Sequence, residues 1–260
     1  MSTKTLLWEL DFTQPNQQEL PASMWSPQNG DGTDFGIPGW GNQELQFYVA
    51  DEAIKFTENG LEFHATKEAT PHRDCYYGKA LWTSARVATK DQRHIQYGWF
   101  EVTMQVPTGK GTWPAFWLLG HDIDDVPWPH CGEIDIMEAR GIAPNELIGT
   151  VHGPSYFGDN GAGKSLFLDA PLAQDFHTFA IDWKPDQIDW YLDGEKYHSV
   201  SAADLPAGEW VFNKEYYILM NLAIGGGFAG QVDPDLTHAQ ATITSIRHFA
   251  VDGVGSFTDY

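Results

Sequence analysis

The chain has 260 residues and carries 36 acidic against 15 basic side chains, a formal net charge of −21. This surface repels nucleic acids, anionic membranes and sulfated or carboxylated polysaccharides, so a neutral partner is predicted. The eleven Trp, ten Tyr and fifteen Phe exceed what a core of this size needs. Sugar rings stack on such side chains, although packing within the core is the alternative explanation for many of them.

Cysteine usage and hydropathy set further limits. Cys75 and Cys131 are the only cysteines, so a disulfide framework is excluded; they either form one bond or are both free. Met1 leads directly into a strand-like segment, without the charged and apolar regions of a signal peptide. No apolar run reaches the ~18 residues of a membrane span. We expect a monomer with no membrane or nucleic-acid partner.

Strand patterns predominate along the chain. A strand over residues 4–12 is followed, over residues 14–41, by a long surface loop rich in Pro, Gly, Asn and Asp. Only residues 201–205 resemble a helical turn. About a dozen short strands with turn residues between them predict an all-β, two-sheet β-sandwich, as a single domain over residues 1–260. The further strands are expected at residues 61–65, 81–87, 98–106, 111–120, 133–138, 148–152, 177–183, 188–192, 195–200, 216–223 and 241–252.

Three carboxylates alternate with large apolar residues in the segment Gly132-Glu133-Ile134-Asp135-Ile136-Met137-Glu138. A period of two places Glu133 and Asp135 on one strand face. Strict alternation would send Glu138 into the core, where an unpaired carboxylate is costly. A β-bulge at Ile136 and Met137 turns both apolar side chains inward and returns Glu138 to the face of Glu133. The segment therefore predicts three acids on one surface.

Three neighbouring carboxylates repel one another, so stability alone does not account for them. Two carboxylates that flank one bond are what hydrolysis of a glycosidic link requires, one as nucleophile or base and the other held protonated as the acid. A solvated acidic strand edge or a calcium site is the alternative. The aromatic residues nearby favour the catalytic interpretation.

Candidate substrate-binding residues surround this segment. Trp113 and Trp117 share a strand face with a small residue between them, which leaves a slot for a sugar ring; core packing is the alternative. Arg86 holds an acid or a sugar hydroxyl, or else forms a surface ion pair. Trp128 lies in an acidic, Pro-rich loop. His152 contacts substrate or an acid, or is structural.

A polar segment between aromatic residues, Trp40-Gly41-Asn42-Gln43-Glu44-Leu45-Gln46-Phe47-Tyr48, is typical of a sugar-binding rim and contributes Asn42. Together with other blocks it resembles glycoside hydrolase family 16, in particular its laminarinase branch of endo-1,3-β-glucanases. The blocks extend over residues 8–252 in family order. The others are Thr83-Ser84-Ala85-Arg86, Trp113-Pro114-Ala115-Phe116-Trp117, residues 132–138, Thr150-Val151-His152-Gly153 and Asn221-Leu222-Ala223-Ile224-Gly225-Gly226.

The resemblance implies a jelly-roll sandwich, concanavalin-like, with an open cleft on its concave face. It implies that Glu133 is the nucleophile, Glu138 the acid/base and Asp135 the residue that orients the nucleophile, in a retaining reaction. The residue inserted at Met137 resembles the bulged motif of laminarinases, which favours β-1,3 links, with mixed-linkage β-1,3-1,4-glucan as a second substrate. Where the family commonly carries a Trp, this chain has Phe228.

A structural calcium ion is also implied, because family members often bind one on the convex face. The matching positions are Asp11, Gly60 and Asp252. Oxygen ligands suit calcium, although Asp252 fits a turn equally well. No cofactor is expected for catalysis. A polymer that cannot enter cells implies that the protein is secreted.

Three other functions use the same features. A lectin-like glucan-binding module explains the aromatic residues but has no need of two glutamates brought to one face. A transglycosylase passes the same covalent intermediate to a sugar acceptor. Agarase or carrageenase activity is disfavoured by the blocks matched and by the scarcity of Lys and Arg.

Overall fold

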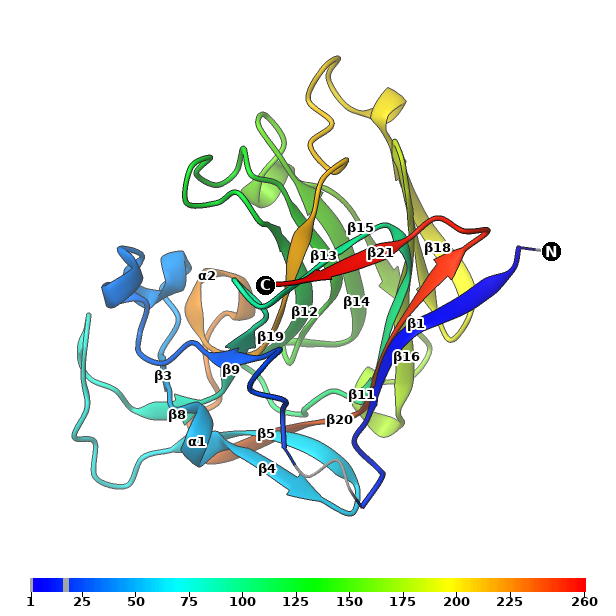
Figure 1. The fold of residues 1–260 in the computed structure, drawn as a ribbon. Helices are drawn as coiled ribbons and strands as arrows, with labels where there is room; N and C mark the ends of the chain where they lie inside the picture. The colour runs from blue at the N-terminus through cyan, green and yellow to red at the C-terminus, as the bar shows by residue number, and fades with distance from the viewer. Residues whose placement is uncertain (1, 16–18) are drawn as a thin grey trace.

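Two β-sheets packed face to face make up most of the computed structural model, which describes residues 2–15 and 19–260 (Figure 1). The predicted all-β sandwich of jelly-roll type is confirmed. In the described part of the chain no helix is long and apolar enough to cross a membrane. The only α-helices there are single turns, α1 (Ala50–Ala53) and α2 (Gly226–Ala229).

The first sheet is built around the long strand β20, which contacts β1, β5 and β11. Its order is β18-β17-β16-β11-β20-β5-β8-β3, with β1 on β20 and β4 on β5, and every pair is antiparallel except β3 with β8. The strands are β1 (Lys4–Asp11), β3 (Gln46–Tyr48), β4 (Ile54–Thr57), β5 (Gly60–Lys67), β8 (Trp82–Ser84), β11 (Gly98–Gln105), β16 (His177–Lys184), β17 (Gln187–Leu192), β18 (Glu195–Ser201) and β20 (His238–Val251).

The second sheet carries the acidic segment near its centre. Its order is β15-β14-β13-β12-β19-β10-β21, with β9 on β19 and β2 on β9. The strands are β2 (Ser26–Pro27), β9 (Arg86–Ala88), β10 (Arg93–Gln96), β12 (Thr112–Gly120), β13 (Glu133–Arg140), β14 (Ala143–His152), β15 (Ala162–Phe167), β19 (Tyr216–Ile224) and β21 (Ser256–Asp259). A separate small hairpin pairs β6 (Asp74–Cys75) with β7 (Gly78–Lys79).

Most predicted strands are confirmed, but the strand expected at residues 81–87 is two strands. It divides at Ala85 into β8 of the first sheet and β9 of the second, because the chain crosses between the sheets there. The helical turn predicted at residues 201–205 is a 3₁₀ turn over Ala202–Asp204. Both cysteines are free, with Cys131 buried.

The predicted bulge is present in β13. Asp135 pairs with Thr150 of β14 and Glu138 pairs with Ile148, so two residues, Ile136 and Met137, lie opposite the single residue between them. Ile136 and Met137 are 1% and 0% exposed and belong to the core between the sheets. The bulge therefore separates the apolar side chains from the carboxylates as the sequence requires.

A tryptophan from the opposite sheet supports the bulge. The indole Nε1–H of Trp190, on β17, donates a hydrogen bond of 2.8 Å to the backbone carbonyl of Asp135. The residue opposite the bulge is Gly149, where a Cβ atom would lie 2.6 Å from the Trp190 ring. Gly149 thus leaves the space through which the indole reaches the bulged strand.

We expect Met137→Gln to lower the free energy of unfolding by about 2–3 kcal/mol, because a side chain of similar shape would bury an amide without a partner. Chemical denaturation measures the change. Had the strand alternated strictly, position 137 would face solvent on the acidic side, and glutamine there would be tolerated. Unchanged stability would therefore contradict the bulge.

Candidate active site

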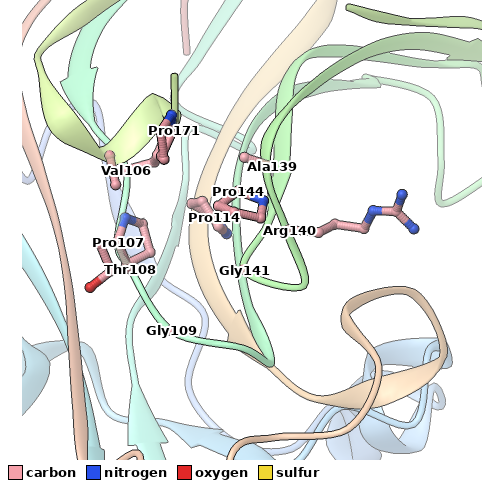
Figure 2. Close-up of a pocket in the computed structure, with 11 residues that line it drawn as sticks. Val106, Pro107, Thr108, Gly109, Pro114, Ala139, Arg140, Gly141, Pro144 and Pro171 are labelled. Atoms are coloured by element: carbon pink, nitrogen blue, oxygen red, sulfur yellow. The ribbon is translucent and has the colours of Figure 1, made fainter. Parts of the chain in front are cut away.

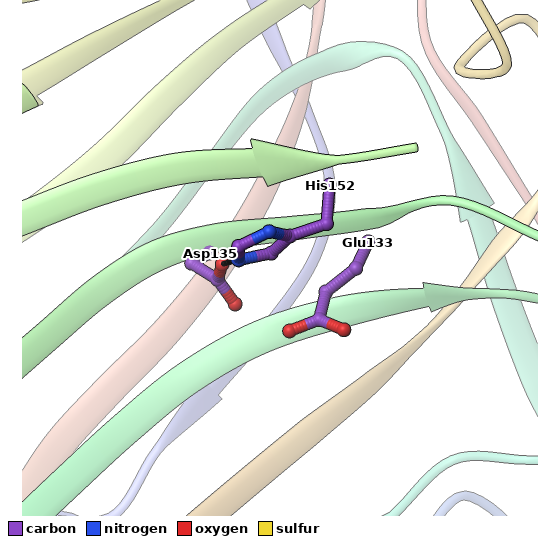
Figure 3. Close-up of side chains that lie close together, drawn as sticks. All are labelled: Glu133, Asp135 and His152. Carbon is purple, nitrogen blue, oxygen red and sulfur yellow. Dashed lines mark ion pairs between the residues drawn. The ribbon is translucent and has the colours of Figure 1, made fainter. Parts of the chain in front are cut away.

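The three acids of β13 lie on the outer face of the second sheet. Figure 3 shows two of them, Glu133 and Asp135, beside His152 of β14. Cross-strand pairing places His152 opposite Glu133, and its Nε2 lies 3.1 Å from Oδ2 of Asp135. Glu133, Asp135 and His152 bring their ligand atoms within 4.8 Å of one another, so they are also the described residues best placed to hold a cation.

Glu138 is the acid whose environment most favours the protonated form. It is 9% exposed, and burial, followed by the charges of Asp135 and Glu133, raises its pKa well above the usual range. Trp113 donates its Nε1–H to Oε1 of Glu138 over 3.0 Å. That hydrogen bond fixes the carboxyl group and partly opposes the rise in pKa.

Glu133 and Asp135 occupy the other end of the cluster. Burial and the charge of Asp135 raise the pKa of Glu133 to about 8, and burial raises the pKa of Asp135 to about 7. His152 and a 2.6 Å hydrogen bond from Nε1 of Trp128 favour the ionised form of Glu133. Since three adjacent carboxylates do not all ionise together, the proton is retained best at Glu138 and the negative charge is stabilised best at Glu133 and Asp135.

The tryptophan pair on β12 differs from the expected open slot. Trp113 is 9% exposed, its N–H is engaged by Glu138, and its ring packs on Phe228 with centroids 4.8 Å apart. Trp113 therefore positions the acid rather than offering a free stacking face. Trp117 is half-buried, and its Nε1–H donates to Oδ1 of Asn221 over 2.8 Å.

Arg86 is buried in the floor of the site and is not a surface residue. Its guanidinium carbon lies over the ring of Trp40, 4.2 Å from the ring centre, and over the ring of Trp117, 5.0 Å from the ring centre. Its Nε donates to Oε1 of Gln28 over 2.6 Å. The group formed by Trp40, Arg86 and Trp117 is called here the arginine sandwich. It lies beside the acids on the same sheet, where β12 and β19 separate Arg86 on β9 from β13.

Two predicted residues lie at the edges of this floor. Asn42 is exposed, and its Nδ2 donates to Oε1 of Glu44 over 3.3 Å. Trp128 is 42% exposed and lies in the loop that precedes β13. Its ring is edge-on to that of the exposed Phe157, with centroids 5.5 Å apart. The structure thus gathers every predicted catalytic and substrate-binding residue along one face.

Four contributors were not predicted: Gln28, Phe157, Asn221 and Phe228. Asn221 begins the matched block of residues 221–226, and Phe228 follows that block by two residues. Their position in or next to the block could have identified them as site residues. Gln28 and Phe157 lie in loops with no periodic pattern, and only the folded structure brings them to the site.

The predicted calcium ligands are not brought together, and that ligand set is corrected here. Asp11 pairs with Ser245 of β20, whereas Asp252 lies beyond the other end of that strand and accepts a hydrogen bond from the backbone N–H of Thr3. Seven residues at ~3.3 Å each separate these points by roughly 23 Å. Gly60 packs on Ile243, near Asp11. Asp252, with φ of 50°, is a turn residue.

An apolar cavity of about 50 Å³ is lined in part by Pro114 of β12 and by Ala139 and Arg140 of β13 (Figure 2). Its walls include Pro107, Pro114, Pro144 and Pro171, and no carboxylate lines it. It therefore has none of the groups that the acidic face provides. The candidate active site is an open face rather than an enclosed cavity, which suits a polymer that must lie across it.

Comparison with known proteins agrees with this geometry. Residues 41–245 match the model of the family described as glycosyl hydrolases family 16. The chain belongs to this family. It is 35% identical to a beta-glucanase of Rhodothermus marinus over 257 residues, covering 95% of this chain and 86% of that protein.

Solved structures of two similar proteins superpose closely on the chain. The laminarinase catalytic domain from Thermotoga maritima has a TM-score of 0.88 at 38% identity, covering 95% of this chain and 98% of that one. The endo-β-1,3-glucanase from Pyrococcus furiosus also has a TM-score of 0.88 at 38% identity, covering 95% of each chain.

In this family 16 hydrolase we expect Trp190→Phe to reduce both stability and turnover. Loss of the hydrogen bond to Asp135 costs about 1–3 kcal/mol of unfolding free energy, and displacement of the bulge lowers kcat by about 10- to 100-fold. Trp183→Phe is the matched control, because its buried indole also donates to a backbone carbonyl, that of Phe212, which is not part of β13. Similar stability losses with a kcat loss in Trp190→Phe alone would support the role of the bulge; equal kcat values would contradict it.

The acids should also make the hydrolase less stable as pH rises. Their pKa values are raised in the folded protein, so the folded state binds more protons than the unfolded state, and stability falls from about pH 4.5 to about pH 8. We therefore expect Glu138→Gln to raise Tm by a few degrees at pH 8 and hardly at all at pH 4. Glu195→Gln, on the exposed end of β18, controls for loss of one charge. A Tm gain that does not depend on pH would be inconsistent with this account.

Proposed function

We propose that the protein is a retaining endo-glycosidase that hydrolyses β-1,3-glucosidic links in laminarin-type glucans. The observation that supports this most directly is the division of roles within one cluster. Glu138 is held protonated by burial and like charges, while Glu133 receives the Trp128 N–H and the positive potential of His152. An acid and a nucleophile on one open face are the requirements of glycosidic hydrolysis with retention.

In the first step Glu138 donates its proton to the leaving glycosidic oxygen while a carboxylate oxygen of Glu133 attacks the anomeric carbon. The glycosidic C–O bond breaks and a glycosyl ester with Glu133 forms. In the second step Glu138, now ionised, takes a proton from water, which attacks the anomeric carbon and releases Glu133 as a carboxylate. Asp135, paired with His152, orients Glu133 throughout.

The substrate class follows from charge and from the relatives. A chain of net charge −21 suits a neutral polymer, and the similar proteins named above are a beta-glucanase, a laminarinase and an endo-β-1,3-glucanase. Mixed-linkage β-1,3-1,4-glucan is proposed as a second substrate. Because such polymers do not enter cells, we propose that the protein acts outside the cell.

The test is reducing-sugar release from laminarin, lichenan and curdlan. We expect laminarin to be cleaved internally, and kcat to fall by about 10²- to 10⁴-fold in Glu133→Gln and Glu138→Gln. NMR during hydrolysis should show the β-anomer first. Binding without release of sugar would identify a lectin-like module, and inverted product would exclude the retaining mechanism. New glucosidic links formed preferentially with added oligosaccharide acceptors would identify a transglycosylase.

A further inference from the structure

Three exposed apolar side chains cluster beside the buried Trp40, beyond the arginine sandwich. Phe35, Ile37 and Tyr76 are 52%, 43% and 40% exposed. They are called here the distal patch. Phe35 and Ile37 come from the long loop before β3, and Tyr76 comes from the turn of the β6–β7 hairpin. Solvated clusters of large apolar residues are costly to maintain and often mark binding sites.

The distal patch is held in place by specific contacts. The buried carboxylate of Asp31 accepts the backbone N–H of Thr33 over 3.0 Å and that of Tyr76 over 2.6 Å, so it ties the two segments together. The Phe35 ring packs on Trp40 with centroids 5.1 Å apart. The Tyr76 ring packs so closely on Gly39 that a Cβ atom there would lie 2.9 Å from it. The patch is therefore a preformed surface.

The distal patch continues the line of the active site. Glu138 pairs with Ala115 of β12, Ala115 with Asn221 of β19, and Asn221 with Arg86 of β9. Three strand spacings of ~4.8 Å place β9 roughly 14 Å from β13. Trp40 covers Arg86, and Phe35 covers Trp40. The patch thus lies beyond the sugars that the catalytic acids can touch, along a path that crosses the strands.

We propose that the distal patch is an additional subsite that binds a further glucose ring of the same neutral β-glucan chain. The proposal rests on the proposed function, because the occupant is the part of the glucan that extends past the arginine sandwich. The apolar C–H face of a glucose ring matches an exposed aromatic ring. An uncharged ring also tolerates the acidic surroundings formed by Asp31 and Asp34. The patch makes binding increase with chain length.

The experiment measures binding in a Glu133→Gln background, so that no substrate is consumed. Calorimetry with laminari-oligosaccharides of three and seven units compares the parent with added Phe35→Ala or Tyr76→Ala. We expect each change to weaken binding of the longer sugar by about fivefold and to leave the trimer unaffected. Tyr76→Phe, which retains the ring, should bind like the parent. Phe176→Ala is the matched control. Phe176 is 42% exposed and directly precedes β16 of the first sheet.

Either equal affinity for the longer sugar in parent and variants, or equal losses for both lengths, would overturn the proposal. A dimer of the parent that dissociates in Phe35→Ala, seen by size-exclusion chromatography, would assign the patch to self-association instead. The proposed function is tested by a different measurement, sugar release by the wild-type protein. If no sugar is released while the length-dependent binding persists, the patch is a glucan subsite on a protein that does not hydrolyse glucan.

Discussion

The hydrogen bond from Trp190 to the backbone carbonyl of Asp135 is the contact on which the catalytic geometry depends. It joins the first sheet to the bulge of β13 at Ile136 and Met137, where the pairing with β14 is irregular. Gly149 makes the contact sterically accessible. With the bulge fixed, Met137 is in the core and Glu138 is on the outer face of the sheet, although the two are adjacent in sequence. The core of the sandwich thus determines the spacing of the acids.

The acids of the active site lower the stability of the fold. Burying Glu138 beside two other carboxylates raises its pKa and disfavours its charge, so a protein selected for stability alone would not retain this cluster. Indole N–H groups limit the cost. Trp113 donates to Glu138 and Trp128 to Glu133, and neither indole titrates. They orient both carboxyl groups without adding a charge. A positive charge beside Glu138 would favour its ionised form, and the proton would no longer be retained there.

The sequence predicted what depends on local pattern and missed what depends on distant pairing. The bulge could be inferred because Met137 needs burial and Glu138 cannot tolerate it without a partner. Trp190 could not be assigned to the bulge, since it lies on the other sheet and 55 residues from Asp135. The strand expected at residues 81–87 failed because nothing local marks a crossing between sheets at Ala85. The calcium ligands failed because the register of β1 against β20 separates Asp11 from Asp252.

The arginine sandwich attaches a long loop to the sheet that carries the acids. Trp40 belongs to the loop before β3 and Trp117 to β12, and the guanidinium of Arg86 lies over both rings. A planar cation can pack against two aromatic faces at once and still donate in its plane, here to Gln28; lysine lacks that geometry. The loop is therefore attached to the sheet through a buried charge. Arg86 thereby holds the loop that carries Trp40 against the strand that carries Trp117.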